Sequence, residues 1–210
     1  MNSDAQLVLL DYQNEEHVDA AAELHKGLLG DSPIPQLGNE FMTKFYYTKL
    51  IKDDLIRCVL CKHRNQYVGF LAYTKHPCNF MLEGKKRYFL YLSFLIFKSL
   101  ISNPLRLRTL LKVIQLSKKR RFKDNKDKIG EILSLGVLTP YLKLGETGLR
   151  VSKLLFEHVA TYFKQEGYVK IQAEVKKDNI PALFFYHSLG ARIEEDCWSK
   201  EGEYLVSVKL

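Results

Sequence analysis

The stretch NIPALFFYHSLG at residues 179–190 follows an apolar run at 170–175 that indicates a strand. Asn179 is a residue type that favours helix caps, and Pro181 falls in the first turn, where its missing N–H is not needed. Gly190 ends the pattern. We therefore expect a strand followed by a helix that runs from Asn179 through Ser188. Helix capping explains Asn179, and packing explains Ala182 and Phe185. Tyr186 has a chemical role only if a reactive group lies beside it.

A second strand, loop and helix lie upstream. Residues 131–138 (EILSLGVL) indicate a buried strand, and residues 151–166 have the apolar spacing of a helix. The loop between them contains Gly145 and Gly148, and glycine lets a backbone approach a ligand closely. The free N–H groups at a helix start bind phosphate well. Taken alone, the segment fits an ordinary loop and a phosphate loop equally well.

The rest of the chain adds strands and helices on both sides of this pair. The spacing predicts a short strand at 7–10, a helix at 15–28, a break at 30–35, a second helix from the cap Asn39 to about Ile51, a hairpin of strands at 56–62 and 67–74, and a final strand pair at 191–197 and 204–210. This order predicts one α/β domain, 1–210, with a mixed sheet and helices on both faces.

Residues 77–130 form a long insertion between two predicted strands. The apolar run at 88–101 is about 14 residues long and contains Lys98, whereas a membrane span needs about 20 apolar residues, so we expect no transmembrane helix. Residues 105–116 indicate a second amphipathic helix, and 118–128 a basic connector.

The net charge of +8 is concentrated in this insertion. Residues 85–128 contain 14 Lys or Arg against 2 Asp, and the rest of the chain is net acidic. Such a segment indicates an anionic partner, an anionic substrate or a solvated face.

The four cysteines do not indicate a metal or redox site. Cys58 and Cys61 form a C-x-x-C inside a predicted strand, where residues three apart point to opposite faces. No His/Cys/Asp cluster has metal-ligand spacing, and residues 1–13 lack a secretory signal pattern. We expect reduced thiols and a cytoplasmic protein.

Two motifs together resemble the GNAT superfamily of N-acetyltransferases. Val137 to Gly145 matches V-x-x-P-x-x-x-x-G, and Asn179 to Gly190 matches N-x-x-A-x-x-F-Y-x-x-x-G. The resemblance covers residues 131–199 well and the front half in element order. It implies a GNAT-like, mostly antiparallel sheet, acetyl-CoA as the cofactor, and transfer of an acetyl group to a primary amine. The phosphate loop is about four residues longer than usual, and Leu142 or Lys143 stands where arginine is expected.

The resemblance also implies roles for particular residues. Acetyl-CoA would lie between strands 131–138 and 170–175. Its contacts would come from the backbone of Leu135 and Val137, from Lys143, Gly145, Thr147, Gly148 and Arg150 at the pyrophosphate, and from Asn179 at the pantetheine arm. Tyr186 would protonate the departing thiolate, and Glu131 or Glu174 would be the base. His76, His158 and His187 are weaker base candidates.

Three roles remain open for the insertion. We favour a lid that contributes to the acceptor pocket; a membrane-surface contact and a subunit interface or decoration are the alternatives. A looser resemblance to GNAT proteins of surface-polysaccharide assembly implies an amino-sugar nucleotide acceptor. The competing function is a non-catalytic GNAT scaffold that binds a membrane surface or another anionic partner. Nucleic acid is not expected, because the aromatic residues precede the basic run instead of alternating with it.

Overall fold

The computed structural model describes residues 5–77, 79–102, 128–142, 150–194 and 202–210. The strands are β1 (Ala5–Leu9), β2 (Arg57–His63), β3 (Gln66–Thr74), β4 (Ile129–Val137), β5 (Lys170–Lys176), β6 (Arg192–Ile193) and β7 (Glu203–Lys209). They form one mixed sheet in the order β1-β2-β3-β4-β5-β7-β6. All neighbouring pairs are antiparallel except β4–β5. The predicted mixed, mostly antiparallel α/β fold is confirmed.

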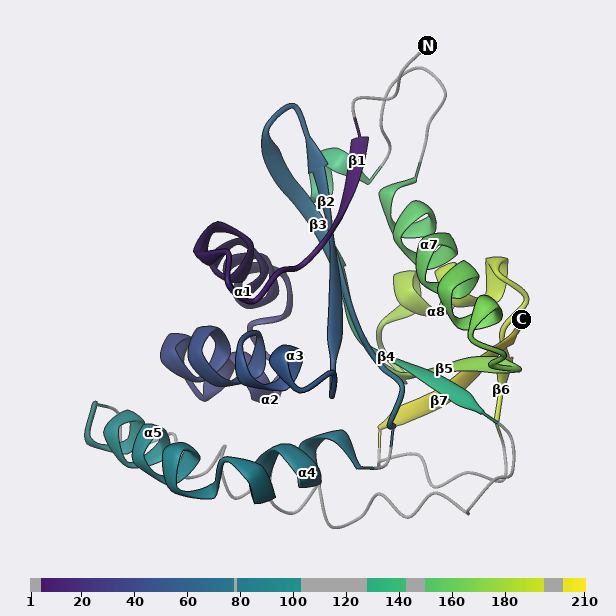
Figure 1. Cartoon of the computed structure of the whole chain (residues 1–210). Coiled ribbons are helices and arrows are strands. Elements are labelled where there is room, and N and C mark those ends of the chain that lie inside the picture. The colour runs from purple at the N-terminus through teal and green to yellow at the C-terminus, as the bar shows by residue number, and fades with distance from the viewer. Residues whose placement is uncertain (1–4, 78, 103–127, 143–149, 195–201) are drawn as a thin grey trace.

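Helices cover both faces of the sheet. They are α1 (Glu15–Leu29), α2 (Pro33–Gln36), the π-helix η1 (Phe41–Tyr46), α3 (Lys49–Lys52), α4 (Phe80–Arg87), α5 (Phe89–Ser102), the 3-10 turn η2 (Thr139–Tyr141), α7 (Val151–Gln165) and α8 (Ile180–Ser188). Figure 1 shows α1 to α3 on one side of the sheet, α7 and α8 on the other, and α4 and α5 along its lower end.

Alternation along β2 supplies a core to each face. Cys58 and Leu60 enter the core under α1 and η1, whereas Val59 and Cys61 enter the core under α7. The prediction that the two cysteines face opposite sides is confirmed. Burial raises the pKa of both thiols, that of Cys61 to about 11, so neither is a reactive thiolate at neutral pH.

The predicted helix from Asn39 to Ile51 is confirmed only in part: residues 39–46 and 49–52 are helical, but the turns at 41–46 are π-helical and the helix breaks at 47–48. The chain instead forms η1, in which the N–H of Tyr47 donates to the carbonyl of Met42, and then the separate short helix α3. Five large side chains of this segment enter the same core cluster. These are Phe41, Met42, Phe45, Tyr46 and Tyr47.

The insertion contains one helix that sequence reasoning missed. α4 precedes the expected helix at 88–101, which is confirmed as α5. Gly84 gives a local reason for the omission, since glycine disfavours a helix interior. In the structure this glycine packs closely on α3: a Cβ at position 84 would lie 2.3 Å from Leu50 Cδ2. Among the helices that the structure describes, none is long and apolar enough to cross a membrane. The predicted helix at 105–116 and the connector at 118–128, apart from Lys128, lie outside the described residues.

The sheet opens between β4 and β5. These strands pair only from Ile129–Lys170 to Ile132–Ala173. At the same point β4 contains an extra residue relative to β3, because Tyr73 pairs with Ile132 and Ala72 with Ser134. Leu133 is therefore a β-bulge, which bends a strand and increases its twist. The bulge turns the rest of β4 away from β5 and creates a fork.

The C-terminal strand pair is confirmed in part. β6 pairs with β7 through Arg192 and Ile193, and β7 lies between β5 and β6. The remainder of the predicted strand at 191–197 falls at 195–201, outside the described residues.

Candidate functional site

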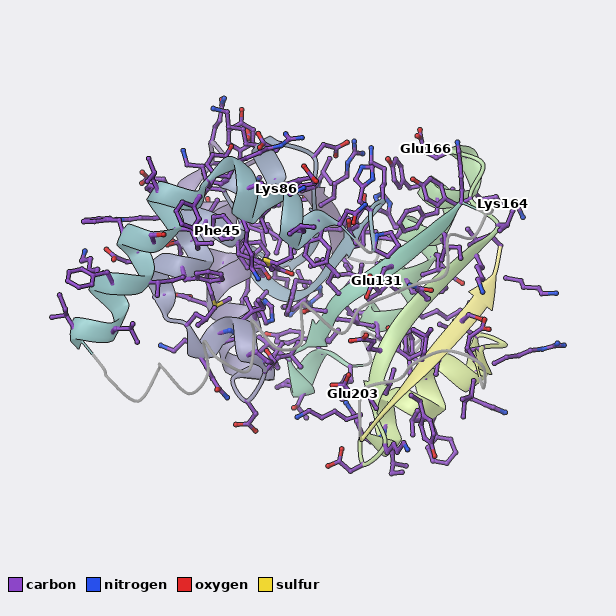
Figure 2. All side chains as sticks on the ribbon, turned by 90° about the horizontal axis from the view of Figure 1, so that it is seen from below. Phe45, Lys86, Glu131, Lys164, Glu166 and Glu203 are labelled. Atoms are coloured by element: carbon purple, nitrogen blue, oxygen red, sulfur yellow. The ribbon has the colours of Figure 1, made fainter. Side chains whose placement is uncertain are left out.

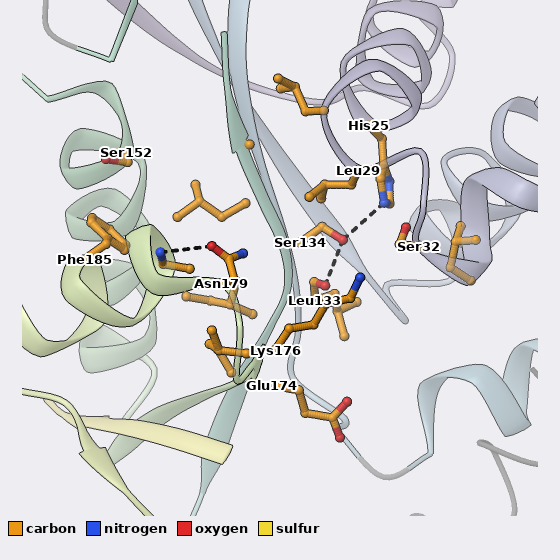
Figure 3. Close-up of a pocket in the computed structure, with 18 of the residues that line it drawn as sticks. His25, Leu29, Ser32, Leu133, Ser134, Ser152, Glu174, Lys176, Asn179 and Phe185 are labelled. Carbon is orange, nitrogen blue, oxygen red and sulfur yellow. Dashed lines mark hydrogen bonds between the residues drawn. The ribbon is translucent and has the colours of Figure 1, made fainter. Parts of the chain in front are cut away.

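A cavity of about 920 Å³ occupies the fork between β4 and β5. Residues 133–137 of β4 line one wall, and residues 173–176 of β5 line the other. Figure 3 shows His25, Leu29 and Ser32 on one side of β4 and Ser152, Asn179 and Phe185 on the other. The cavity therefore passes through the sheet and reaches both helical layers.

The structure brings most of the sequence-predicted site residues together. The described ones that line this cavity are Glu131, Leu135, Val137, Arg150, Glu174, Asn179 and Tyr186. Lys143, Gly145, Thr147 and Gly148 lie outside the described residues. His76, His158 and His187 are exposed and do not line the cavity.

Backbone groups of β4 form part of the cavity wall. Leu135 and Val137 pair with Leu71 and Gly69 of β3 on one edge of β4. Their other edge faces the fork, because β5 has already diverged. An extended ligand can occupy such a strand edge through main-chain hydrogen bonds, as an added strand would.

The start of α7 supplies the cationic end of the cavity. Arg150 is the N-cap residue, and the first helical hydrogen bond runs from the N–H of Leu154 to the carbonyl of Arg150. The N–H groups of residues 151–153, in the first turn of α7, therefore have no acceptor within the helix, and the helix dipole is positive at this end. Arg150 and Ser152 both line the cavity. This end is suited to a phosphate group.

Asn179 has the capping role that its sequence context indicates. Its Oδ1 accepts a hydrogen bond of 3.2 Å from the N–H of Ala182. The side chain is exposed and lines the cavity, so capping fixes a polar group at the entrance of the fork.

Tyr186 lies on α8 against Phe156 and Phe185, with ring centroids 6.4 and 5.3 Å away. The residue is only 6% exposed and lines the cavity. Burial raises the pKa of its phenol well above the usual range, so the hydroxyl stays protonated and can donate a hydrogen bond at neutral pH.

Carboxylates gather in the cavity lining. Glu131 is 1% exposed and lies immediately before the fork, and Glu174 lies immediately after the last β4–β5 pair. The adjacent residues Ile132, Ala173 and Val175 belong to the core on the α7 side. Because successive side chains of a strand point to opposite faces, Glu131 and Glu174 point to the α1 side of the sheet. Glu203 and Asp31 also line the cavity. Figure 2 shows Glu131 on β4 beside the helical layer and Glu203 at the start of β7.

A buried histidine that sequence reasoning missed also lines the cavity. His25 Nδ1 lies 2.8 Å from Tyr47 Oη, and its Nε2 lies 3.3 Å from Ser134 Oγ. Burial lowers the pKa of His25 to about 4. The available signal was its position on the apolar stripe of α1, three to four residues from Ala21, Ala22 and Leu28.

The insertion reaches the cavity through the start of α4. Phe80 and Met81 line it together with Pro33 and Ile34 of α2. The α1 side of the cavity is therefore closed by apolar groups from two segments that are about 50 residues apart in the chain.

No family model and no curated protein matches the sequence. Solved structures do match the fold over nearly the whole chain. The PaiA N-acetyltransferase of Thermoplasma acidophilum, solved with coenzyme A, has a TM-score of 0.56 at 13% identity and covers 98% of this chain and 99% of its own. The GNAT domain of S. lividans PAT has a TM-score of 0.58 at 12% identity, over 98% and 90%. The N-acetyltransferase PseH of Campylobacter jejuni, solved with acetyl coenzyme A, has 0.51 at 16%, over 98% and 98%.

These sequence identities are low, so the comparisons establish the fold alone. The chain has the GNAT fold, and the resemblance deduced from two C-terminal motifs is confirmed at that level. The matches also extend over the front half, where the sequence supported only the order of elements.

Proposed function

We propose that this protein is an N-acetyltransferase that transfers an acetyl group from acetyl-CoA to a primary amine. The observation that carries the proposal is the fork between β4 and β5, which opens a cavity of about 920 Å³ in a GNAT fold. The residues present fit acetyl-CoA. The free edge of β4 suits an extended amide-bearing arm, and Arg150 with the first turn of α7 suits a pyrophosphate.

The lining residues match the needs of direct acyl transfer. The amine nitrogen bonds to the thioester carbonyl carbon, the carbon–sulfur bond breaks, and a proton must leave the nitrogen. Glu131 and Glu174 flank the fork on the α1 side and are the proposed proton acceptors. Tyr186 is the proposed donor to the departing sulfur. Lys143, Gly145, Thr147 and Gly148 remain predicted phosphate contacts, and Asn179 a predicted contact to the arm.

The acceptor that the described lining favours is a positively charged amine. Asp31, Glu131, Glu174 and Glu203 line the cavity, whereas its described cations are Lys176 and, at the α7 end, Arg150. Carboxylates attract a cationic acceptor and repel phosphate. An amino-sugar nucleotide, which the looser family resemblance implied, would need cations from outside this described lining for its phosphates.

A membrane-surface contact is a second proposal, supported by the exposed face of α5. Five large apolar side chains of this helix are 62–82% exposed: Phe89, Leu90, Phe94, Phe97 and Ile101. The described part of α5 contains no acidic residue, and the chain's basic residues are concentrated in the same insertion. An apolar face beside cations is typical of a helix that lies on anionic lipid. This contact is compatible with catalysis or with a purely binding role.

Calorimetric titration with acetyl-CoA tests the main proposal. We expect one site per chain with a micromolar dissociation constant. Arg150→Ala should weaken binding about 10-fold, because a charge-assisted contact to phosphate is lost. Lys164→Ala, at the exposed far end of α7, is the matched control and should bind normally.

Thiol release then identifies the acceptor class. We expect release with 1,4-diaminobutane to exceed release with UDP-glucosamine. The opposite preference would reverse the proposed acceptor charge, and absence of acetyl-CoA binding at millimolar ligand would leave the non-catalytic scaffold.

A further inference from the structure

We propose that His25 is a positioning residue for acyl transfer, which acts through Ser134 to hold the β4 bulge at the fork. The proposal rests on the acetyltransferase function above. It assigns a catalytic consequence to contacts of His25 on α1 with Tyr47, just after η1, and with Ser134 on β4, which is 109 positions away in the chain.

The bulge explains why the contact exists. Ile132 and Leu135 both face the α7 core, whereas Leu133 packs toward the α1 core and Ser134 reaches His25. Two successive side chains therefore point to the α1 side, as a bulge allows. Without the extra residue, the alternation of β4 would turn Ser134 away from α1.

The proposal includes an assignment of the protons in this network, which follows from the Ser134–Leu133 contact. The Ser134 hydroxyl donates to the Leu133 carbonyl over 2.8 Å, so Ser134 Oγ accepts from His25. In this assignment Nε2 of His25 carries the proton, and Nδ1 accepts from the hydroxyl of buried Tyr47. Each group has a partner, and the chain ends on the carbonyl of the bulge residue (Figure 3).

This arrangement makes His25 a poor proton acceptor. With this assignment, Nε2 already holds a proton, and the lone pair of Nδ1 accepts the Tyr47 hydroxyl. The aromatic rings of Phe70, Tyr46 and Tyr47 also surround the imidazole, with centroids 5.2 to 6.0 Å away, and keep it out of water. The burial that lowers the pKa of His25 to about 4 acts in the same direction. His25 stays neutral and fixes geometry.

Two amide variants separate the bonds. In His25→Gln the amide nitrogen comes near the position of Nε2 and can still donate to Ser134. In His25→Asn the amide comes near Nδ1, so it can meet Tyr47 and cannot reach Ser134. Ser134→Ala removes the link from the other side. Val18→Ala, a buried change on α1 away from the cavity, controls for loss of helix packing.

We expect His25→Asn and Ser134→Ala to lower kcat about 10- to 100-fold, because reacting groups tolerate little displacement. Acetyl-CoA affinity should stay within about threefold of wild type, since the α7 end is untouched. His25→Gln should keep most of kcat, and Val18→Ala should keep all of it at a temperature where it is folded. The apparent pKa values of the pH–rate profile should not move in any variant. Rates are measured with the better of the two amine probes.

Nitrogen-15 NMR of labelled histidine tests the network without any activity measurement. His25 should show a single neutral tautomer with its proton on Nε2 from about pH 6 to 8. An imidazolium, or the other tautomer, would overturn the assignment. So would an active wild type whose kcat survives His25→Asn, or a His25 variant that removes an ionisation from the pH–rate profile. A wild type that neither binds acetyl-CoA nor releases thiol ends the proposed function, and the catalytic role with it.

Discussion

Tyr186 shows how burial changes the chemistry of one side chain. A free thiol has a pKa of about 8.5 and a phenol about 10, so proton transfer from phenol to thiolate is uphill even in water. Burial raises the pKa of Tyr186 further and widens that gap. The hydroxyl is therefore better suited to donating a hydrogen bond to developing negative charge on sulfur than to losing its proton outright.

Tyr186→Phe tests this role because it keeps the ring packing and removes the hydroxyl. We expect kcat to fall about 10- to 1000-fold with little change in acetyl-CoA affinity. Tyr73→Phe is the matched control, since Tyr73 is equally buried in the same core and does not line the cavity. Unchanged turnover, with chemistry shown to be rate-limiting, removes Tyr186 from the mechanism. Parallel losses of affinity and thermal stability would make the hydroxyl structural.

At the scale of elements, α4 ties the insertion to the acceptor side of the cavity. Met81 lines the cavity, whereas the adjacent Leu82 is 50% exposed and does not. We expect Met81→Ala to raise the acceptor KM about 3- to 10-fold through lost apolar contact, and to leave acetyl-CoA binding unchanged. Leu82→Ala should leave both constants alone. Equal effects of the two substitutions on the acceptor KM would argue against a lid formed by this helix.

The elements that were predicted correctly are those whose ends are marked by capping or helix-breaking residues in the sequence. Asn179 and Pro181 placed the start of α8, and Gly190 its end, because caps and breakers act within a few residues. A helix was correctly predicted at Phe41–Tyr46, but its π turns were not, since an apolar pattern of six residues does not distinguish an α turn from the wider π turn. α4 was missed because its glycine disfavours a helix locally, and the glycine packs against Leu50, more than 30 residues away in the sequence.

The candidate site also contains residues that a local motif predicted and residues that only tertiary packing brings together. Tyr186 and Asn179 belong to a motif that is local in sequence, and Glu131, Leu135 and Val137 belong to one strand. His25 and Ser134 could not be paired from sequence, because their contact depends on a bulge and on the packing of α1 against β4. The start of α4 was equally hidden, since nothing in residues 80–81 indicates a cavity wall.

At the scale of the whole molecule, apolar surface and basic charge coincide in the insertion. The exposed face of α5 is formed mainly by Phe and aliphatic side chains, which is unusual for a helix facing water. Lys86 and Arg87 of α4 and Lys98 of α5 form exposed ion pairs with the carboxylates of Glu83, Asp53 and Glu40. Exposed pairs of this kind are weak, so these cations can exchange their partners for lipid phosphate.

Vesicle sedimentation tests whether this face meets a membrane. We expect the protein to sediment with phosphatidylserine-containing vesicles at low salt, to be released at high salt, and to leave pure phosphatidylcholine vesicles largely unbound. Phe94→Ser with Phe97→Ser should weaken binding about 10-fold or more by removing two inserting side chains. Leu9→Ser, an exposed apolar change on β1, should have no effect. Protein that stays in the supernatant with anionic vesicles contradicts the contact, and a concentration-dependent mass that the double variant abolishes assigns the face to a second copy of the chain instead.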